Sequence, residues 1–149
     1  AKESGYTFEE MKTLVKEHNI LITKANSDAL GSLFNNCFER VEKECPGKVK
    51  LVSALGKLNY FKAMDQCDFM LGNTSSGIIE AASFGKYVIN VGDRQKGRLR
   101  NENVKDVQFE SEEILIAINS IADLGSCCRI NKYVTPGTTD AVIDIILNK

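Results

Sequence analysis

Residues 68–91 read DFMLGNTSSGIIEAASFGKYVINV, and this stretch decides the fold class. Two short apolar runs, residues 68–71 and 87–91, flank a polar loop and the apolar segment 78–84. Strands that are short and apolar without alternation are typical of a parallel sheet, which is buried on both faces. The segment between them predicts a short helix ending at Gly85, because glycine is common just past a helix end. The stretch therefore predicts a strand–helix–strand unit of a parallel sheet.

The same alternation of strand and helix patterns continues on both sides of this unit. Further strands are predicted at residues 19–23, 48–55 and 105–109, and further helices at 8–17, 30–45, 59–66, 112–124 and 140–147. Alternating elements of this kind form a doubly wound parallel sheet with helices on both faces. We therefore predict one Rossmann-like α/β domain over residues 1–149, which the last two helices close.

Composition and charge exclude several classes of function. Lys and Arg number 19 and Asp and Glu number 20, so the net charge is −1 and bulk attraction to nucleic acid is not expected. No signal-peptide pattern stands at the start, and no apolar run approaches the roughly 20 residues of a membrane helix. The five cysteines are at positions 37, 45, 67, 127 and 128, without a C-x-x-C pair, and His18 is the only histidine. We therefore expect buried, unpaired cysteines, no metal site and a reducing, cytoplasmic location.

In a parallel sheet of this kind ligands bind at the carboxyl ends of the strands, so the loops that follow the strands form the candidate site. These loops span residues 24–31, 53–57, 72–77 and 92–100. In the third loop, the hydroxyls of Thr74 and Ser75 and the free N–H groups of the next helix suit a phosphate. The alternative is that one of these hydroxyls only caps the helix, and the two roles do not exclude each other. Neither a P-loop nor a G-x-G-x-x-G motif is present.

Three further polar residues lie in or beside these loops. Glu80 is the charged residue of an otherwise apolar helix, and a buried carboxylate needs partners. A capping box explains Glu80 only with Gly77 as the cap, so we favour ligand binding, since a carboxylate accepts both hydrogen bonds of a ribose diol. Arg94 is the cation closest to its strand end and suits bidentate contact with a phosphate, the alternative being a solvated charged loop. Asn26 faces the same crevice as a hydrogen-bond donor and acceptor.

Two segments carry a resemblance to a known family. GNTSSGIIEA at residues 72–81 and VINVGDRQKGR at residues 88–98 closely resemble the UDP-N-acetylglucosamine 2-epimerases. They look most like the hydrolysing branch, which makes N-acetylmannosamine and UDP, and Asn26-Ser27-Asp28 is similar to the Asn-x-Asp loop of that branch. The resemblance implies two Rossmann-like domains in the glycosyltransferase-B arrangement, with the active site in the cleft between them. It makes this chain the carboxyl-terminal, UDP-binding half.

The resemblance also implies a role for each candidate residue. The matched positions are Thr74 and Ser75 for the diphosphate, Glu80 for the ribose diol, Arg94 near the phosphates, Asn26 facing the nucleotide sugar and Leu55 contacting uracil through its backbone. No role is assigned to Ser76. These six positions are the predicted UDP-binding residues.

The chemistry of the family sets the expected partners. It begins with proton abstraction at C2 of the sugar and elimination of UDP, and water then adds in the hydrolysing branch. The family's acids lie in the amino-terminal domain, so we expect no catalytic residue in 1–149, no cofactor, and the amino-terminal domain of the same protein as partner. The family's tendency to dimerise implies a homo-oligomer. The alternatives are a non-hydrolysing epimerase, a glycosyltransferase of the same architecture and a non-catalytic nucleotide-sugar binding module.

Overall fold

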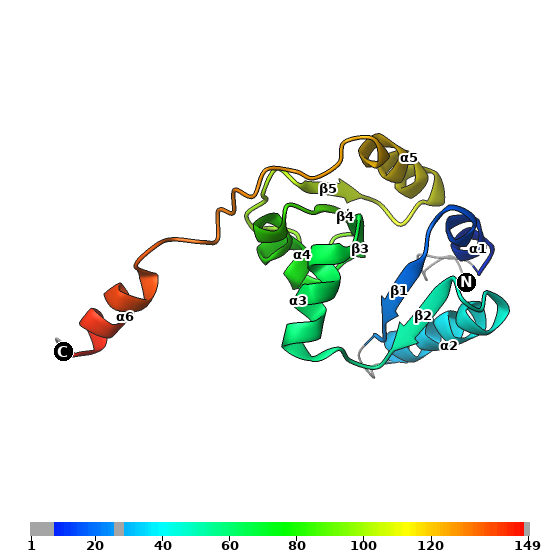
Figure 1. Ribbon diagram of the computed structural model, residues 1–149, viewed down its shortest axis with the longest axis horizontal. Coiled ribbons are helices and arrows are strands. Elements are labelled where there is room, and N and C mark those ends of the chain that lie inside the picture. Colours follow the sequence, from blue (N-terminus) through cyan, green and yellow to red (C-terminus); the bar gives the residue numbers. More distant parts are fainter. Residues whose placement is uncertain (1–7, 26–28, 148–149) are drawn as a thin grey trace.

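The computed structural model describes residues 8–25 and 29–147, drawn in Figure 1. Helices and strands alternate along most of the chain. In order they are α1 (Phe8–Glu17), β1 (Ile20–Thr23), α2 (Ala29–Glu44), β2 (Val49–Val52), α3 (Gly56–Gln66), β3 (Phe69–Gly72), α4 (Ser75–Ile79), the 3-10 helix η1 (Ala81–Phe84), β4 (Tyr87–Val91), β5 (Val104–Val107), α5 (Ser111–Ala122) and α6 (Thr138–Leu147). This order confirms the predicted α/β class.

All strand pairs among the described residues are parallel, as predicted. The hydrogen bonds form two ladders, β1–β2 and β3–β4–β5, in place of one continuous sheet. Gly72 pairs with Asn90 and Asn90 with Asp106, so the carboxyl ends of β3, β4 and β5 meet at one edge. A single hydrophobic cluster includes Ile22 of the first ladder and Ile89 of the second, so packing joins the two ladders. The arrangement is Rossmann-like.

The β3–β4–β5 ladder is covered on both faces. Ile89 and Val91 of β4 pack in the same cluster as Ile114 of α5, whereas Val88 packs with Met64 of α3 and the start of η1. Figure 1 shows α5 on one side of this ladder and α3 and α4 on the other. Every residue from position 88 to 91 is buried, as the unalternating sequence of this strand predicts.

The β1–β2 ladder is covered on one face only. Ile22, Val49 and Leu51 are buried with Val41 of α2. Leu21, on the opposite face of β1, keeps 49% of its surface exposed. The prediction that β1 is buried on both faces is therefore wrong, because no described helix covers its second face.

The last helix does not close the domain. α5 buries four side chains, but α6 buries none, and 67% of Ile146 is exposed. Figure 1 shows α6 projecting from the body of the chain. The apolar residues of α6 predict a helix correctly, but they do not specify a contact within this chain.

Several boundaries differ from the predicted ones. β2 ends at Val52 and α3 begins at Gly56, so the strand is shorter and the helix longer than predicted. The predicted helix 78–84 is in fact two short helices, and Gly85 ends the second with φ 68°. The five cysteines are free, as expected, but four are only half-buried and Cys128 is exposed. None of the helices within the described residues is long and apolar enough to cross a membrane.

Candidate functional site

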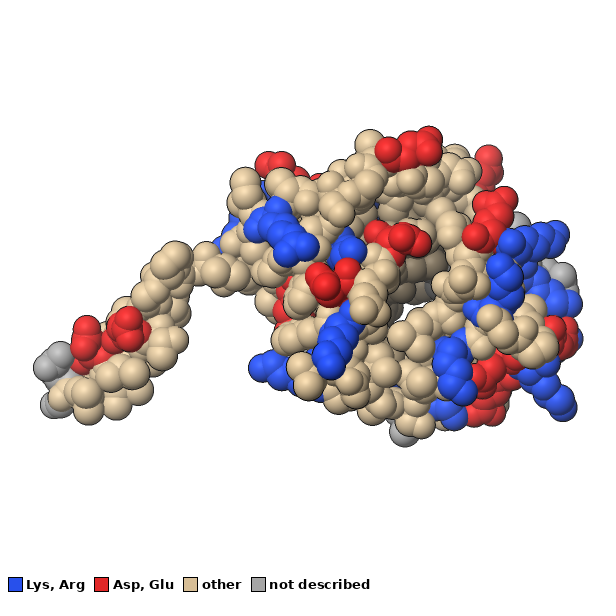
Figure 2. Space-filling model, in the orientation of Figure 1, with Lys and Arg blue, Asp and Glu red and all other residues tan. Residues whose placement is uncertain are grey.

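A groove of about 360 Å³ opens at the carboxyl ends of β1 and β2. Its lining residues are Thr23, Ala54, Leu55, Gly56, Lys57, Tyr60, Phe61 and Glu80. The face drawn in Figure 2 is hollowed between the α3 side and the β1–β2 side, and Lys, Arg, Asp and Glu are interspersed over it. A groove with two aromatic rings, a backbone turn and one carboxylate suits a small polar ligand with a flat ring.

A second depression, of about 600 Å³, lies at the opposite ends of the same strands. Its wall includes Asn19, Pro46 and Lys48, which precede β1 and β2. Parallel sheets bind ligands at the carboxyl ends of their strands, and none of the predicted site residues lines this depression. The smaller groove is therefore the candidate site.

Leu55 and Glu80 come from separate parts of the chain and line the same groove. Leu55 is the N-cap residue of α3, and with its neighbours Ala54 and Gly56 it forms one wall. Glu80 follows the last residue of α4 and forms another wall. The structure therefore brings together two of the predicted residues.

The surroundings of Glu80 differ from those that the sequence suggests. Glu80 stands at the joint between α4 and η1, and its backbone N–H donates to the Ser76 carbonyl at 2.9 Å. Thr74 is the N-cap of α4, so a capping box starting at Gly77 is excluded. The Glu80 side chain is half-buried, and within the described residues it has no hydrogen bond or ion pair. The carboxylate is thus available to a ligand in the groove.

A chain of hydroxyls leads from the loop after β3 into the groove. Thr74 Oγ1 lies 3.2 Å from Ser76 Oγ, and Ser76 Oγ lies 2.5 Å from the hydroxyl of Tyr60. Thr74 and Ser75 are exposed, and Thr74 makes no side-chain cap bond to α4. The capping alternative for Thr74 is therefore not realised, and both hydroxyls remain accessible at the edge of the site.

Comparison with known proteins adds an independent observation. The family model described as UDP-N-acetylglucosamine 2-epimerase matches residues 2–147. The chain belongs to this family. It is 41% identical over 109 residues to a GDP/UDP-N,N'-diacetylbacillosamine 2-epimerase (hydrolyzing) of Campylobacter jejuni, a match that covers 69% of this chain and 28% of that protein.

Two other relatives agree with this membership. A UDP-N,N'-diacetylbacillosamine 2-epimerase (hydrolyzing) of Legionella pneumophila is 37% identical over 99 residues, covering 66% of this chain and 26% of that protein. Polysialic acid biosynthesis protein P7 of Escherichia coli is 31% identical over 106 residues, covering 71% of this chain and 27% of that protein. The matched part of this epimerase-family chain thus spans about a quarter of each relative's length.

Arg94 lies on the other loop at this edge of the epimerase-family chain. The loop turns tightly after β4, since the N–H of Lys96 donates to the Asp93 carbonyl at 2.9 Å, and the Arg94 side chain is exposed. It does not line the groove beside Glu80. The structure therefore brings Arg94 to the predicted edge of the sheet, but not into direct contact with Glu80 or Leu55.

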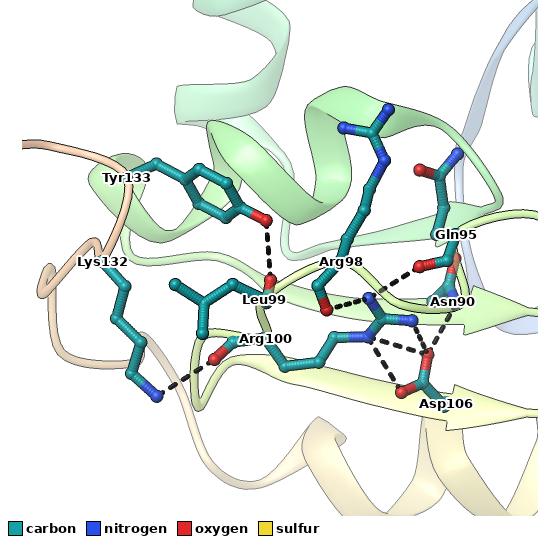
Figure 3. A network of polar contacts seen from close by, with 8 residues as sticks. All are labelled: Asn90, Gln95, Arg98, Leu99, Arg100, Asp106, Lys132 and Tyr133. Atoms are coloured by element: carbon teal, nitrogen blue, oxygen red, sulfur yellow. Dashed lines mark hydrogen bonds and ion pairs between the residues drawn. The ribbon is translucent and has the colours of Figure 1, made fainter.

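A polar network fixes the loop that carries Arg94 (Figure 3). Arg100 donates from Nε to the Asp106 carboxylate at 3.0 Å and from Nη1 to the Gln95 carbonyl at 2.9 Å. Asn90 Nδ2 donates to Asp106 Oδ1 at 2.6 Å. Partial burial raises the pKa of Asp106, but the hydrogen bonds from Arg100 and Asn90 and the charge of Arg100 outweigh it and hold that pKa below its usual value.

Sequence reasoning did not single out the groove residues Lys57, Tyr60 and Phe61. Tyr60 and Phe61 read as the apolar side of a helix, and Lys57, whose Nζ lies 5.8 Å from the Phe61 ring centre, lies in the turn where α3 begins. The hydroxyl of Tyr60 was the available signal, since a phenol on an apolar face needs a polar neighbour. Asn26 lies outside the described residues.

Proposed function

We propose that this chain is the UDP-binding, carboxyl-terminal part of a hydrolysing UDP-N-acetylglucosamine 2-epimerase, which converts UDP-N-acetylglucosamine to N-acetylmannosamine and UDP. The observation that carries the proposal is the groove shared by Leu55 and Glu80 in a chain of the epimerase family. The groove lies at the edge where Rossmann-like sheets bind nucleotides.

The groove supplies contacts for the uridine part of the ligand. The backbone at residues 54–56 offers hydrogen-bonding groups to the edge of the uracil, and the rings of Tyr60 and Phe61 offer apolar surface to its face. The Glu80 carboxylate accepts hydrogen bonds from the two ribose hydroxyls, as an acidic residue does in dinucleotide-binding folds.

The loops after β3 and β4 supply contacts for the diphosphate. Thr74 and Ser75 donate from their hydroxyls, and Arg94 offers a guanidinium that matches a phosphate in a bidentate geometry. When UDP departs from the sugar, negative charge grows on its β-phosphate, and a cation held nearby stabilises that transition state. The chain thus stabilises the leaving group.

The proton transfers require groups that we do not assign to this chain. We assign them to the amino-terminal part of the same polypeptide, with the cleft between two domains in the glycosyltransferase-B arrangement. We include in the proposal a cytoplasmic location, supported by five cysteines without a disulfide, and a homo-oligomeric state. The chain by itself is then expected to bind UDP weakly and to turn over no substrate.

The binding half of the proposal is tested with UDP and 2′-deoxy-UDP. We expect the chain to bind UDP more tightly than 2′-deoxy-UDP in an NMR titration. Glu80→Gln is expected to weaken UDP binding by about tenfold, the worth of a charge-assisted hydrogen bond, and to weaken 2′-deoxy-UDP binding less, because that nucleotide keeps only the 3′-hydroxyl. Glu102→Gln, an exposed carboxylate outside the groove, is the matched control. Equal binding of the two nucleotides by the unsubstituted chain would contradict the role of Glu80.

The catalytic half is tested by product analysis with the full-length protein. Free sugar plus UDP is the expected product, whereas a UDP-sugar product indicates a non-hydrolysing epimerase. Sugar transfer that depends on an acceptor indicates a glycosyltransferase, and UDP-sugar binding without turnover indicates a binding module. Turnover by residues 1–149 alone would refute the assignment of the proton transfers to the amino-terminal part of the polypeptide.

A second sugar substrate has a specific observation in its favour. Two of the relatives bear names that specify N,N'-diacetylbacillosamine rather than N-acetylglucosamine. The residues described above contact the uridine diphosphate, which the two substrates share, so they do not select between the sugars. Parallel assays of the full-length protein with both UDP-sugars decide which one it uses.

A further inference from the structure

Gln95 connects the two loops of the site that carry the predicted phosphate contacts. Its Nε2 donates to the Asn73 carbonyl at 2.7 Å, across 22 residues of sequence. The side chain is only 4% exposed although its neighbours Arg94 and Lys96 are exposed. The residue thus reaches inward from a surface turn and ties that turn to the residue before Thr74.

The backbone of Gln95 is held from the other side. Its carbonyl accepts from Arg100, and Arg100 is paired with Asp106 at the end of β5. Figure 3 shows the Arg100 side chain extending toward Asp106, while the Gln95 side chain points the other way. One residue therefore couples the loop after β3 to the polar edge of β4 and β5.

We propose that Gln95 is a positioning residue for the diphosphate of a bound nucleotide, holding the turn of Arg94 at a set distance from Thr74 and Ser75. The inference rests on the proposed function and adds the residue that arranges its phosphate contacts. It follows from the Gln95–Asn73 hydrogen bond, which joins the loop after β3 directly to the loop after β4. Holding both loops before the ligand arrives lowers the ordering cost of binding.

The positioning role of Gln95 predicts which part of the nucleotide depends on this residue. Uridine uses the groove lined by Leu55 and Glu80, which is separate from Gln95. The diphosphate of UDP uses both loops that Gln95 connects. Loss of the Gln95 side-chain donor must therefore weaken the binding of UDP and leave the binding of uridine unaffected. General damage to the fold would weaken the binding of both.

The test variant is Gln95→Met, which keeps the length of the side chain and removes the donor. The matched control is Asn103→Leu. Asn103 is also a buried amide, 2% exposed, whose Nδ2 donates to a backbone carbonyl, that of Lys86, at 2.6 Å. Like Gln95, it has a buried side-chain oxygen without a partner among the described residues, but it lies at the opposite ends of the strands.

UDP and uridine are titrated into the chain and both variants by NMR. We expect Gln95→Met to weaken the binding of UDP by about tenfold, the effect of one hydrogen bond, and the binding of uridine by less than about twofold. Asn103→Leu is expected to leave the ratio of the two affinities unchanged. An unchanged ratio in Gln95→Met, in a chain that prefers UDP to uridine, overturns the positioning role alone. A wild-type chain that binds neither ligand overturns the proposed function, and the diphosphate role of Gln95 with it.

Amide hydrogen exchange tests the tie between the loops without a ligand. We expect faster exchange at residues 73–77 in Gln95→Met, by several-fold, and no change there in Asn103→Leu. Unchanged exchange at residues 73–77 in Gln95→Met would show that the amide does not restrain this loop, and would overturn the inference even if UDP affinity falls.

Discussion

The two parallel ladders of this chain begin from similar strands and end in different surroundings. β1 contains Ile20, Leu21 and Ile22, and β4 contains Val88, Ile89 and Val91, so both read as apolar runs without alternation. In β4 all of these side chains are buried, whereas in β1 burial alternates and Leu21 faces outward. An apolar run thus predicts a strand, but the neighbouring helices determine how many of its faces are covered.

The difference extends to the candidate site. The loops carrying Thr74 and Arg94 leave the ladder that is covered on both faces, and Gln95 ties them to each other. The turn containing Leu55 leaves the ladder that is covered on one face. We therefore expect the phosphate side of the site to be more rigid than the uracil side, and the following changes test how far the difference between the ladders goes.

The largest effect is expected in the centre of the covered ladder. Ile89 is fully buried, so Ile89→Ala leaves a cavity and is expected to lower the free energy of unfolding by about 2–5 kcal/mol. Leu21→Ala, at the outward face of β1, is expected to cost less than about 1 kcal/mol. Urea unfolding measures both, and equal losses would mean that the second face of β1 is covered in solution.

A smaller effect is expected where β4 passes into the loop of Arg94. Gly92 has φ 75°, and a Cβ there would lie 2.4 Å from Cε2 of Phe109, so Gly92→Ala is expected to cost about 1–3 kcal/mol. Gly97→Ala is the matched control, since Gly97 has φ 84° but no atom within 4 Å of the added Cβ. Thermal unfolding of both variants separates the backbone strain from the contact with Phe109, and equal shifts would show that the contact contributes nothing.

Asp106, at the polar edge of the β3–β4–β5 ladder, is expected to make a pH-dependent contribution to the free energy of unfolding. The pKa of Asp106 is lowered in the folded chain, so its stabilising effect is present above the unfolded pKa of about 3.9 and is lost as pH falls through the folded value. Asp106→Asn should therefore flatten the loss of stability between about pH 5 and pH 2. The carboxylate is half-exposed, so the effect is expected below about 1 kcal/mol. Identical pH profiles from urea unfolding would contradict the lowered pKa.

The smallest effect is expected in α6, which has no covered face among the described residues. Ile146→Ala removes no buried contact and is expected to change the free energy of unfolding of this chain by less than about 0.5 kcal/mol. A loss of unfolding free energy above about 1 kcal/mol in urea unfolding would show that α6 packs against the rest of this chain in solution.

The positions of several candidate site residues were predictable because they depend on the order of strands and loops along the chain. The turns and loops that hold Leu55, Thr74, Ser75 and Arg94 follow strands, and parallel strands bring such segments to one edge. The Tyr60–Ser76 and Gln95–Asn73 contacts were not predictable, since they join residues 16 and 22 positions apart through side-chain directions that the backbone sets. The roles of Leu55, Thr74, Ser75, Glu80 and Arg94 in binding UDP remain predictions, as does that of Asn26.

The sequence by itself determined the order of the elements, the parallel pairing and the edge at which the candidate site lies, because apolar periodicity and glycine positions act over a few residues. Only the tertiary structure decided that β1 keeps one face open, that α6 stays apart, that Glu80 stands at a joint between two helices, and that Gln95 ties the two loops together. These depend on which surfaces meet, and a short apolar or polar pattern is compatible with several partners until the whole chain is packed.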